Sequence, residues 1–340
     1  MRSHALVGAA CLALVLGASA SGCGKKSSSD TSAPSAELTG LAVVPANAEV
    51  VIGIDVAKVA GSQLVQRAVD QLMLRDADLA ARWQKLHDSC KLDLGQQVKR
   101  VMLAIGPHVG DKPGTGPTVM IATGTLVEND FAACVRAMVG QGGGSLTAKD
   151  VNGHTLYQAK DGARTMFFAF GRPDTVVLGA NEAYVAEALS NNPKIESDAD
   201  MKRYLSLANQ QAPVWAAGRV DPRVRAGLPA ITQGKLTAGP VAFAVAIDPS
   251  DGAKVELSAV MANDADAKAL ESFAKSELGF LAMASQIKSL QRVVDRFEVS
   301  STPDSVVHFT AKLSIDDVNQ LLTALDGGPA PAQGSAPSGP

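Results

Sequence analysis

Short apolar segments, each followed by turn-forming residues, dominate the middle of this 340-residue chain and restrict its fold more than any other feature. Four such segments lie near residues 145–151, 154–159, 164–170 and 175–179. Asn152 and Gly153 separate the first two segments, and Asp161 and Gly162 separate the second from the third. Asn-Gly is the strongest short hairpin signal, because a type I′ turn needs a positive φ at both central residues. The pattern predicts consecutive antiparallel hairpins.

The rest of the body, from Leu38 to Asp326, alternates apolar segments with amphipathic ones. Strands are predicted near residues 50–54, 101–105, 118–122, 214–220, 241–247, 254–261, 294–301 and 305–313. Helices are predicted to begin near Ser62, Glu128, Asp264 and Ser314. Because hairpins join most of the strands, we expect an α+β fold with largely antiparallel sheets and with helices on one face.

Equal spacing between the two parts of the body suggests an internal duplication. The helices predicted at Glu128 and Asp264 begin 136 residues apart, and the strands that precede them are equally far apart. A repeat of this kind indicates one structural unit used twice. We therefore expect two duplicated α+β modules, residues 38–205 and residues 206–326.

The first 22 residues have the pattern of an export signal. Arg2 supplies a positive charge, and residues 5–18 are apolar or small throughout. A charged start followed by an apolar run of about 7–15 residues is typical of signal peptides. The run is too short for a permanent membrane span, which needs about 20 apolar residues. We expect residues 1–22 to direct export and to be removed.

Residues 20–23, Ala-Ser-Gly-Cys, resemble the lipobox of bacterial lipoproteins, in which the cysteine is lipidated and becomes the mature N-terminus. The family most often has Leu where this chain has Ala20, so secretory cleavage without a lipid remains an alternative. The resemblance implies that a lipid on Cys23 attaches the protein to a membrane of the cell envelope. Gly24, by likeness to Gram-negative lipoproteins, favours the outer membrane, with the body on its periplasmic or surface face.

Two segments of low complexity flank the body. Residues 23–37 are mostly Ser, Lys and other small or polar residues, which is the composition of a flexible tether. Residues 327–340 are rich in Pro, Gly, Ser and Ala, which is the composition of a disordered tail.

Two cysteines remain in the exported body, Cys90 and Cys134. Exported proteins usually oxidise such pairs, and Cys134 shares the apolar face of a predicted helix with Phe131 and Val135. We therefore expect a structural disulfide between them. A nucleophilic Cys90 assisted by His87 is the alternative, but no orienting carboxylate or oxyanion motif accompanies this pair.

Composition and motifs argue against several classes of function. Lys plus Arg is 31 and Asp plus Glu is 34, so the net charge of −3 argues against a nucleic-acid partner. Three Asp-Ala-Asp triplets open predicted helices, where acidic capping explains them better than a metal ion does. The glycine-rich residues 140–144 follow a helix, whereas nucleotide-binding glycines follow a strand. We expect no metal, no cofactor and no catalytic residues.

Two features remain as candidates for contact with a ligand. Arg219, Arg223 and Arg225 cluster at the end of a predicted strand and could contact a phosphate or carboxylate, although a solvated loop is the simpler interpretation. Residues 278–284 are apolar on all sides, so they belong either to the core or to a surface that binds a partner or faces lipid.

Residues 41–55 loosely resemble the start of uncharacterised bacterial envelope proteins, which have a Leu…Pro-x-x-Ala element and an apolar strand ending in Asp. The matching residues are Leu41, Pro45, Ala48 and Asp55, and the resemblance implies no catalytic residues. The sequence therefore favours a lipid-anchored, non-enzymatic envelope protein with a binding or structural role. Its partner would be another envelope component or an apolar ligand. An envelope hydrolase with an unrecognised site and a periplasmic small-molecule binding protein are the alternatives.

Overall fold

The computed structural model describes residues 39–90, 94–110, 115–284 and 294–325. Its strands are β1 (Val50–Asp55), β2 (Val98–Ile105), β3 (Thr118–Gly124), β4 (Ser145–Val151), β5 (His154–Asp161), β6 (Arg164–Arg172), β7 (Thr175–Gly179), β8 (Val214–Arg219), β9 (Ala242–Asp248), β10 (Ala253–Val260), β11 (Phe297–Thr302) and β12 (Val306–Leu313). Its helices are η1 (Gly40–Val43), α2 (Val56–Ala60), α3 (Gln63–Arg75), α4 (Ala77–Ser89), α5 (Leu94–Gln97), α6 (Glu128–Gln141), α7 (Glu182–Leu189), η2 (Ile195–Ser197), α8 (Ala199–Leu207), α9 (Pro222–Ile231), α10 (Asp264–Ala284) and α12 (Ile315–Leu325).

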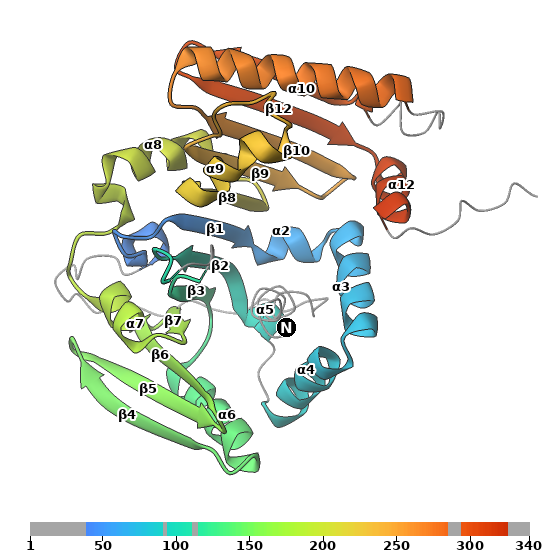
Figure 1. The fold of residues 1–340 in the computed structure, drawn as a ribbon. Coiled ribbons are helices and arrows are strands. Elements are labelled where there is room, and N and C mark those ends of the chain that lie inside the picture. The colour runs from blue at the N-terminus through green and yellow to red at the C-terminus, as the bar shows by residue number, and fades with distance from the viewer. Residues whose placement is uncertain (1–38, 91–93, 111–114, 285–293, 326–340) are drawn as a thin grey trace, which may run out of the picture.

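One antiparallel sheet of 12 strands joins all of the described strands, in the order β11-β12-β10-β9-β8-β1-β2-β3-β7-β6-β5-β4 (Figure 1). Helices combined with a large antiparallel sheet confirm the predicted α+β class. The strands of the first part lie on one side of the β1–β8 pair and those of the second part lie on the other. Val51 is opposite Ala217 in this central pair.

The local signals in the sequence act as predicted. Asn152 and Gly153, with φ of 57° and 81°, form the turn between β4 and β5. Ser62 accepts a hydrogen bond from the Val65 amide at 3.3 Å and so caps α3.

Helices cover both faces of the sheet, and this corrects the expectation of helices on one face. Val119 and Ile121 of β3 belong to the same buried cluster as α7, whereas Met120 and Ala122 belong to a cluster that contains Ala132 of α6. Alternate side chains of a strand point to opposite faces, so α6 and α7 pack on opposite faces of β3. The physical reason is that β3 is apolar at every one of these positions and has two faces to bury.

The largest core cluster spans both parts of the chain. It combines Val51, Val119 and Val177 of the first part with Trp215 and Ala244 of the second. The sequence predicts a boundary between two modules at residues 205 and 206. The core therefore contains residues from both sides of this boundary. The predicted export signal, Cys23, the predicted tether and the predicted tail of residues 327–340 lie outside the described residues.

Candidate functional site

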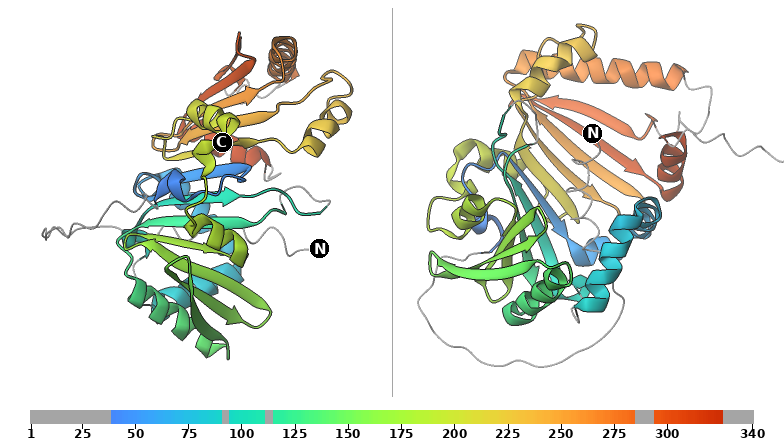
Figure 2. Two further views of the ribbon diagram at one scale, coloured as in Figure 1. Left: turned by 90° about the vertical axis from the view of Figure 1, so that its left-hand side faces the viewer. Right: turned by 60° about the horizontal axis from the view of Figure 1, so that its bottom comes forward.

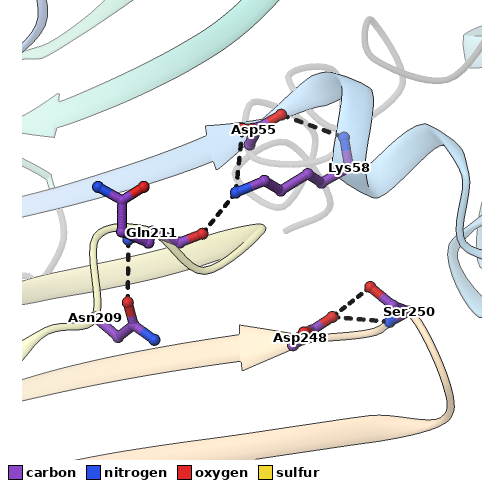
Figure 3. Close-up of polar contacts among 6 residues, drawn as sticks. All are labelled: Asp55, Lys58, Asn209, Gln211, Asp248 and Ser250. Carbon is purple, nitrogen blue, oxygen red and sulfur yellow. Dashed lines mark hydrogen bonds and ion pairs between the residues drawn. The ribbon is translucent and has the colours of Figure 1, made fainter.

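A polar cavity of about 210 Å³ lies where the end of β1 meets β8, β9 and β10 (Figure 3). Its lining comes from α2, from the loop before β8, and from the β9–β10 hairpin. The lining residues are Lys58, Asn209, Gln211, Ala212, Pro213, Ala246, Asp248, Ser250, Lys254 and Glu256. Both parts of the chain therefore contribute to the site.

Lys58 enters the site from α2, and Asp55 fixes its position. The Asp55 carboxylate accepts a hydrogen bond from the Lys58 amide at 3.2 Å and so caps the start of α2. The Lys58 Nζ lies 3.6 Å from the other Asp55 oxygen and donates to the Gln211 carbonyl at 2.7 Å (Figure 3). Two contacts thus hold the ammonium group of this lining residue, which belongs to the first part of the chain.

The loop before β8 forms a second wall. The Asn209 side-chain oxygen accepts from the Gln211 amide at 3.1 Å, which closes a local turn. The Asp55 amide donates to the Pro213 carbonyl at 2.8 Å, so this loop is joined to the end of β1. Backbone groups therefore fix the geometry of this wall.

The β9–β10 hairpin supplies charges of both signs. Asp248 and Lys254 are directly opposite each other in the strand register, and Lys254 forms an ion pair with Glu256 at 2.6 Å. Hydrogen bonds from the Ser250 hydroxyl and amide lower the pKa of Asp248, and nearby Lys254 acts in the same direction. The hydrogen bond and charge of Glu256 raise the pKa of Lys254. Both groups are therefore held in their ionised forms near neutral pH.

The arrangement can bind a small polar ligand through opposite charges. Lys58 and Lys254 are matched to a carboxylate or phosphate, and Asp248 and Glu256 are matched to an ammonium group. The Ser250 hydroxyl donates to Asp248 two residues away, which is a local turn contact. The sequence does not reveal this site, because its charged residues come from separate segments and none belongs to a recognisable motif.

Two of the three predicted arginines have separate partners within the chain. Arg219 donates to both carboxylate oxygens of Asp198, at 2.8 and 2.7 Å. Arg223 donates to the Gly110 carbonyl at 3.2 Å. Arg225 is partly buried on α9. Two of the three guanidinium groups are thus engaged by the chain itself, so the predicted anion contact gains no support from their arrangement.

The two body cysteines lie together in the structure. Cys90 and Cys134 form a disulfide, with Cα atoms 5.0 Å apart and a sequence separation of 44 residues. Both residues are buried. The bond joins the end of α4 to α6, and it is the pairing that the sequence predicts. A cysteine in a disulfide has no free thiol, so this arrangement does not favour the alternative of a Cys90 nucleophile.

The structure also brings Ser258 and His308 together, on the facing strands β10 and β12. The Ser258 hydroxyl is 3.0 Å from the His308 Nδ1. A catalytic pair needs a third group that orients the histidine, and no hydrogen bond to another His308 ring atom is present among the described residues. We interpret the contact as a cross-strand hydrogen bond that satisfies two partly buried groups.

Within the described ranges, no group of three or more His, Cys, Asp or Glu side chains is placed to hold a metal ion. No helix of the described part is long and apolar enough to cross a membrane. Comparisons with known protein families, with curated proteins and with solved structures give no match for this chain.

Proposed function

We propose that this chain is a lipid-anchored, non-enzymatic protein of the bacterial envelope with a binding or structural role. The observation that carries the proposal is Cys23, which directly follows an export signal and precedes a polar tether. The disulfide between Cys90 and Cys134 supports it, because disulfides persist in oxidising compartments such as the periplasm. The polar cavity supports a binding role, since its charged residues match a small ligand that carries both a positive and a negative group.

We also propose that the body consists of two duplicated α+β modules that share one sheet. The support is the order of strands outward from the central pair, which is β1-β2-β3-β7-β6 on one side and β8-β9-β10-β12-β11 on the other. In both series the third strand is followed in the chain by a helix, α6 or α10. Strands β4 and β5 then extend the first module beyond the shared pattern.

Replacement of the lipidated residue tests the anchor. In the Cys23→Ser variant no thiol can accept the lipid, so we expect the protein to move from the membrane fraction to the soluble fraction of the envelope. The measurement is fractionation, combined with the intact mass of the mature protein. Cys11→Ser is the matched control, because it changes a cysteine within the leader and should leave the membrane association unchanged.

Two results would contradict the anchor. Cys23→Ser could stay with the membrane to the same extent as the wild type. Alternatively, the mature wild-type protein could lack an added lipid mass, which would favour simple secretory cleavage.

A further inference from the structure

One face of the central strands, on the side opposite to α7 and α8, is apolar. Residues directly opposite in paired strands share a face, and the register places Leu103, Ile52, Ala216, Val245 and Leu257 in one row across β2, β1, β8, β9 and β10. We define the apolar face as this row with its neighbours of the same orientation, which are Val50, Ile54, Ile105, Val214, Phe243, Ile247 and Val255.

On these strands the small side chains are buried and the larger apolar ones are partly exposed, whereas large apolar side chains are usually the buried ones. In β9, Ala242, Ala244 and Ala246 are buried, whereas Phe243, Val245 and Ile247 between them are partly exposed. In β1, Val51 and Gly53 are buried, whereas Ile52 and Ile54 are partly exposed. Large branched and aromatic side chains therefore face away from the main core. The larger side chains of this surface are partly exposed, whereas Ala216 is buried. A contiguous, partly exposed apolar surface of this kind is a candidate site of interaction.

Two described helices on this side pack against outer strands, whereas α2 packs against β1 and β2, where Ile54 and Leu103 lie against the buried cluster that contains Val56. α10 packs against β11 and β12, and α6 packs against β4 and β5. Figure 2 (right) shows these helices at opposite edges of the sheet, with the central strands between them. α8 packs on the other face, where Met201 and Leu205 share a cluster with Trp215. The apolar face is thus bordered by helices on its own side.

The chemistry of the apolar face selects the kind of occupant. None of its side chains carries a charge or a hydrogen-bonding group. Its strands are interior strands with a partner on each side, so their backbone groups are used within the sheet and no further strand can be added. An occupant must therefore bring apolar surface without polar groups that need partners. A lipid acyl chain meets this condition.

The dimensions of the face agree with such an occupant. Five adjacent strands, about 4.8 Å apart, span roughly 19 Å. One leaflet of a bilayer, which is half of a hydrocarbon core of about 30 Å, is about 15 Å thick. An acyl chain could therefore lie across the row of side chains from β2 to β10.

The length of chain before the body supplies the source of the lipid. Residues 24–38 separate Cys23 from the first described residue, and 15 residues can extend to at most about 50 Å. A lipid on Cys23 would therefore keep the start of the body within about 50 Å of the bilayer, so that the body can turn the apolar face toward it. We infer that the apolar face binds an acyl chain of a membrane phospholipid. This inference rests on the lipid anchor of the proposed function.

Photo-crosslinking in vesicles tests the inference. The full-length lipidated protein is incorporated into phosphatidylcholine vesicles that contain a phospholipid with a diazirine on its acyl chain. The label is mapped to tryptic peptides, of which residues 236–254 carry β9. We expect this peptide to be labelled. Val245→Asp places a charge at the centre of the face and should lower the labelling about tenfold, since the burial of a valine side chain contributes about as much as a tenfold change in affinity.

Ile231→Asp is the matched control, because Ile231 is 77% exposed on α9, outside the apolar face, and its loss should leave the labelling unchanged. Circular dichroism checks that each variant is folded. If Val245→Asp does not fold, Val245→Thr, which keeps the shape of the side chain, is used instead and should lower the labelling several-fold.

Three outcomes would overturn the inference. The β9 peptide could remain unlabelled, it could be labelled equally in the Val245 variants, or it could be labelled in Cys23→Ser but not in the wild type. The third outcome would show that the protein's own anchor lipid occupies the face. Vesicle flotation measures the anchor separately. A failure to float rejects the proposed function, whereas an unlabelled β9 peptide in protein that floats rejects this inference alone.

Discussion

At the scale of single residues, Asp198 links two elements of the structure. Its carboxylate accepts from the Met201 amide at 2.9 Å and caps α8, and it also pairs with Arg219 at the end of β8. The hydrogen bond from Met201 is the main cause that lowers the pKa of Asp198, and Arg219 adds to it. The folded state therefore favours the ionised carboxylate more than the unfolded state does.

Two substitutions of Asp198 separate these contributions. Asp198→Asn keeps a capping oxygen but loses the charge, whereas Asp198→Ala loses both. At pH 7 we expect Asp198→Ala to lower the free energy of unfolding by about 2 kcal/mol, and Asp198→Asn to lower it less. Urea unfolding measures both changes. Equal losses in the two variants would contradict a separate contribution from the cap, and an Asp198→Asn variant as stable as the wild type would contradict a contribution from the charge.

The sign of the pH dependence follows from the lowered pKa of Asp198. The carboxylate stabilises the folded state fully above its unfolded pKa, and this contribution is lost as the pH falls through the lower folded pKa. The wild type should therefore exceed Asp198→Asn in free energy of unfolding by less and less as the pH is lowered from about 6 to about 3. A difference that is constant over this range would exclude the proposed ionic contribution.

At the scale of elements, the contact between β1 and β8 depends on a glycine. The Trp215 side chain covers Gly53, and a Cβ at this position would lie 2.2 Å from the indole. Gly53→Ala should therefore lower stability by about 1–3 kcal/mol through overpacking. Gly140→Ala is the control, because no atom lies within 4 Å of its Cβ and alanine favours the α6 helix by about 0.5–1 kcal/mol. The midpoint temperature of thermal unfolding should fall for Gly53→Ala and rise for Gly140→Ala. An unchanged midpoint for Gly53→Ala would contradict the overpacking and show that Trp215 can move.

Local signals predict the elements well, because their physics lies within a few residues. Ser314 and Asp317 form a capping box where the sequence predicts the start of a helix, with reciprocal hydrogen bonds of 2.9 and 3.2 Å. The pairing of β1 with β8 joins residues about 160 positions apart, and no local pattern encodes it. No local pattern encodes the polar cavity either, since its lining residues Lys58, Gln211 and Lys254 come from three separate segments. The alternation of alanines with large residues in β9 is visible in the sequence and could have indicated the apolar face.

At the scale of the whole molecule, the shared sheet makes the two proposed modules dependent on each other. β8 is an interior strand only because β1 covers one side of it. A fragment of residues 206–326 would expose β8 as an open edge, with unpaired backbone groups beside apolar side chains that are buried in the full chain. Exposed edges of this kind pair with other strands.

We therefore expect the residue 206–326 fragment to self-associate, with β8 of one copy against β8 of another in the antiparallel arrangement that β1 and β8 have in the full chain. Size-exclusion chromatography with light scattering should give a mass that rises with concentration, whereas the full chain, whose β8 is covered, is the control. If the modules were duplicated, the β8–β8 pair would closely reproduce the β1–β8 contact, so a discrete dimer is the expected product. A folded fragment that stays monomeric at all concentrations would mean that the second module is stable without β1, and that the central pair joins two independent units rather than completing one sheet.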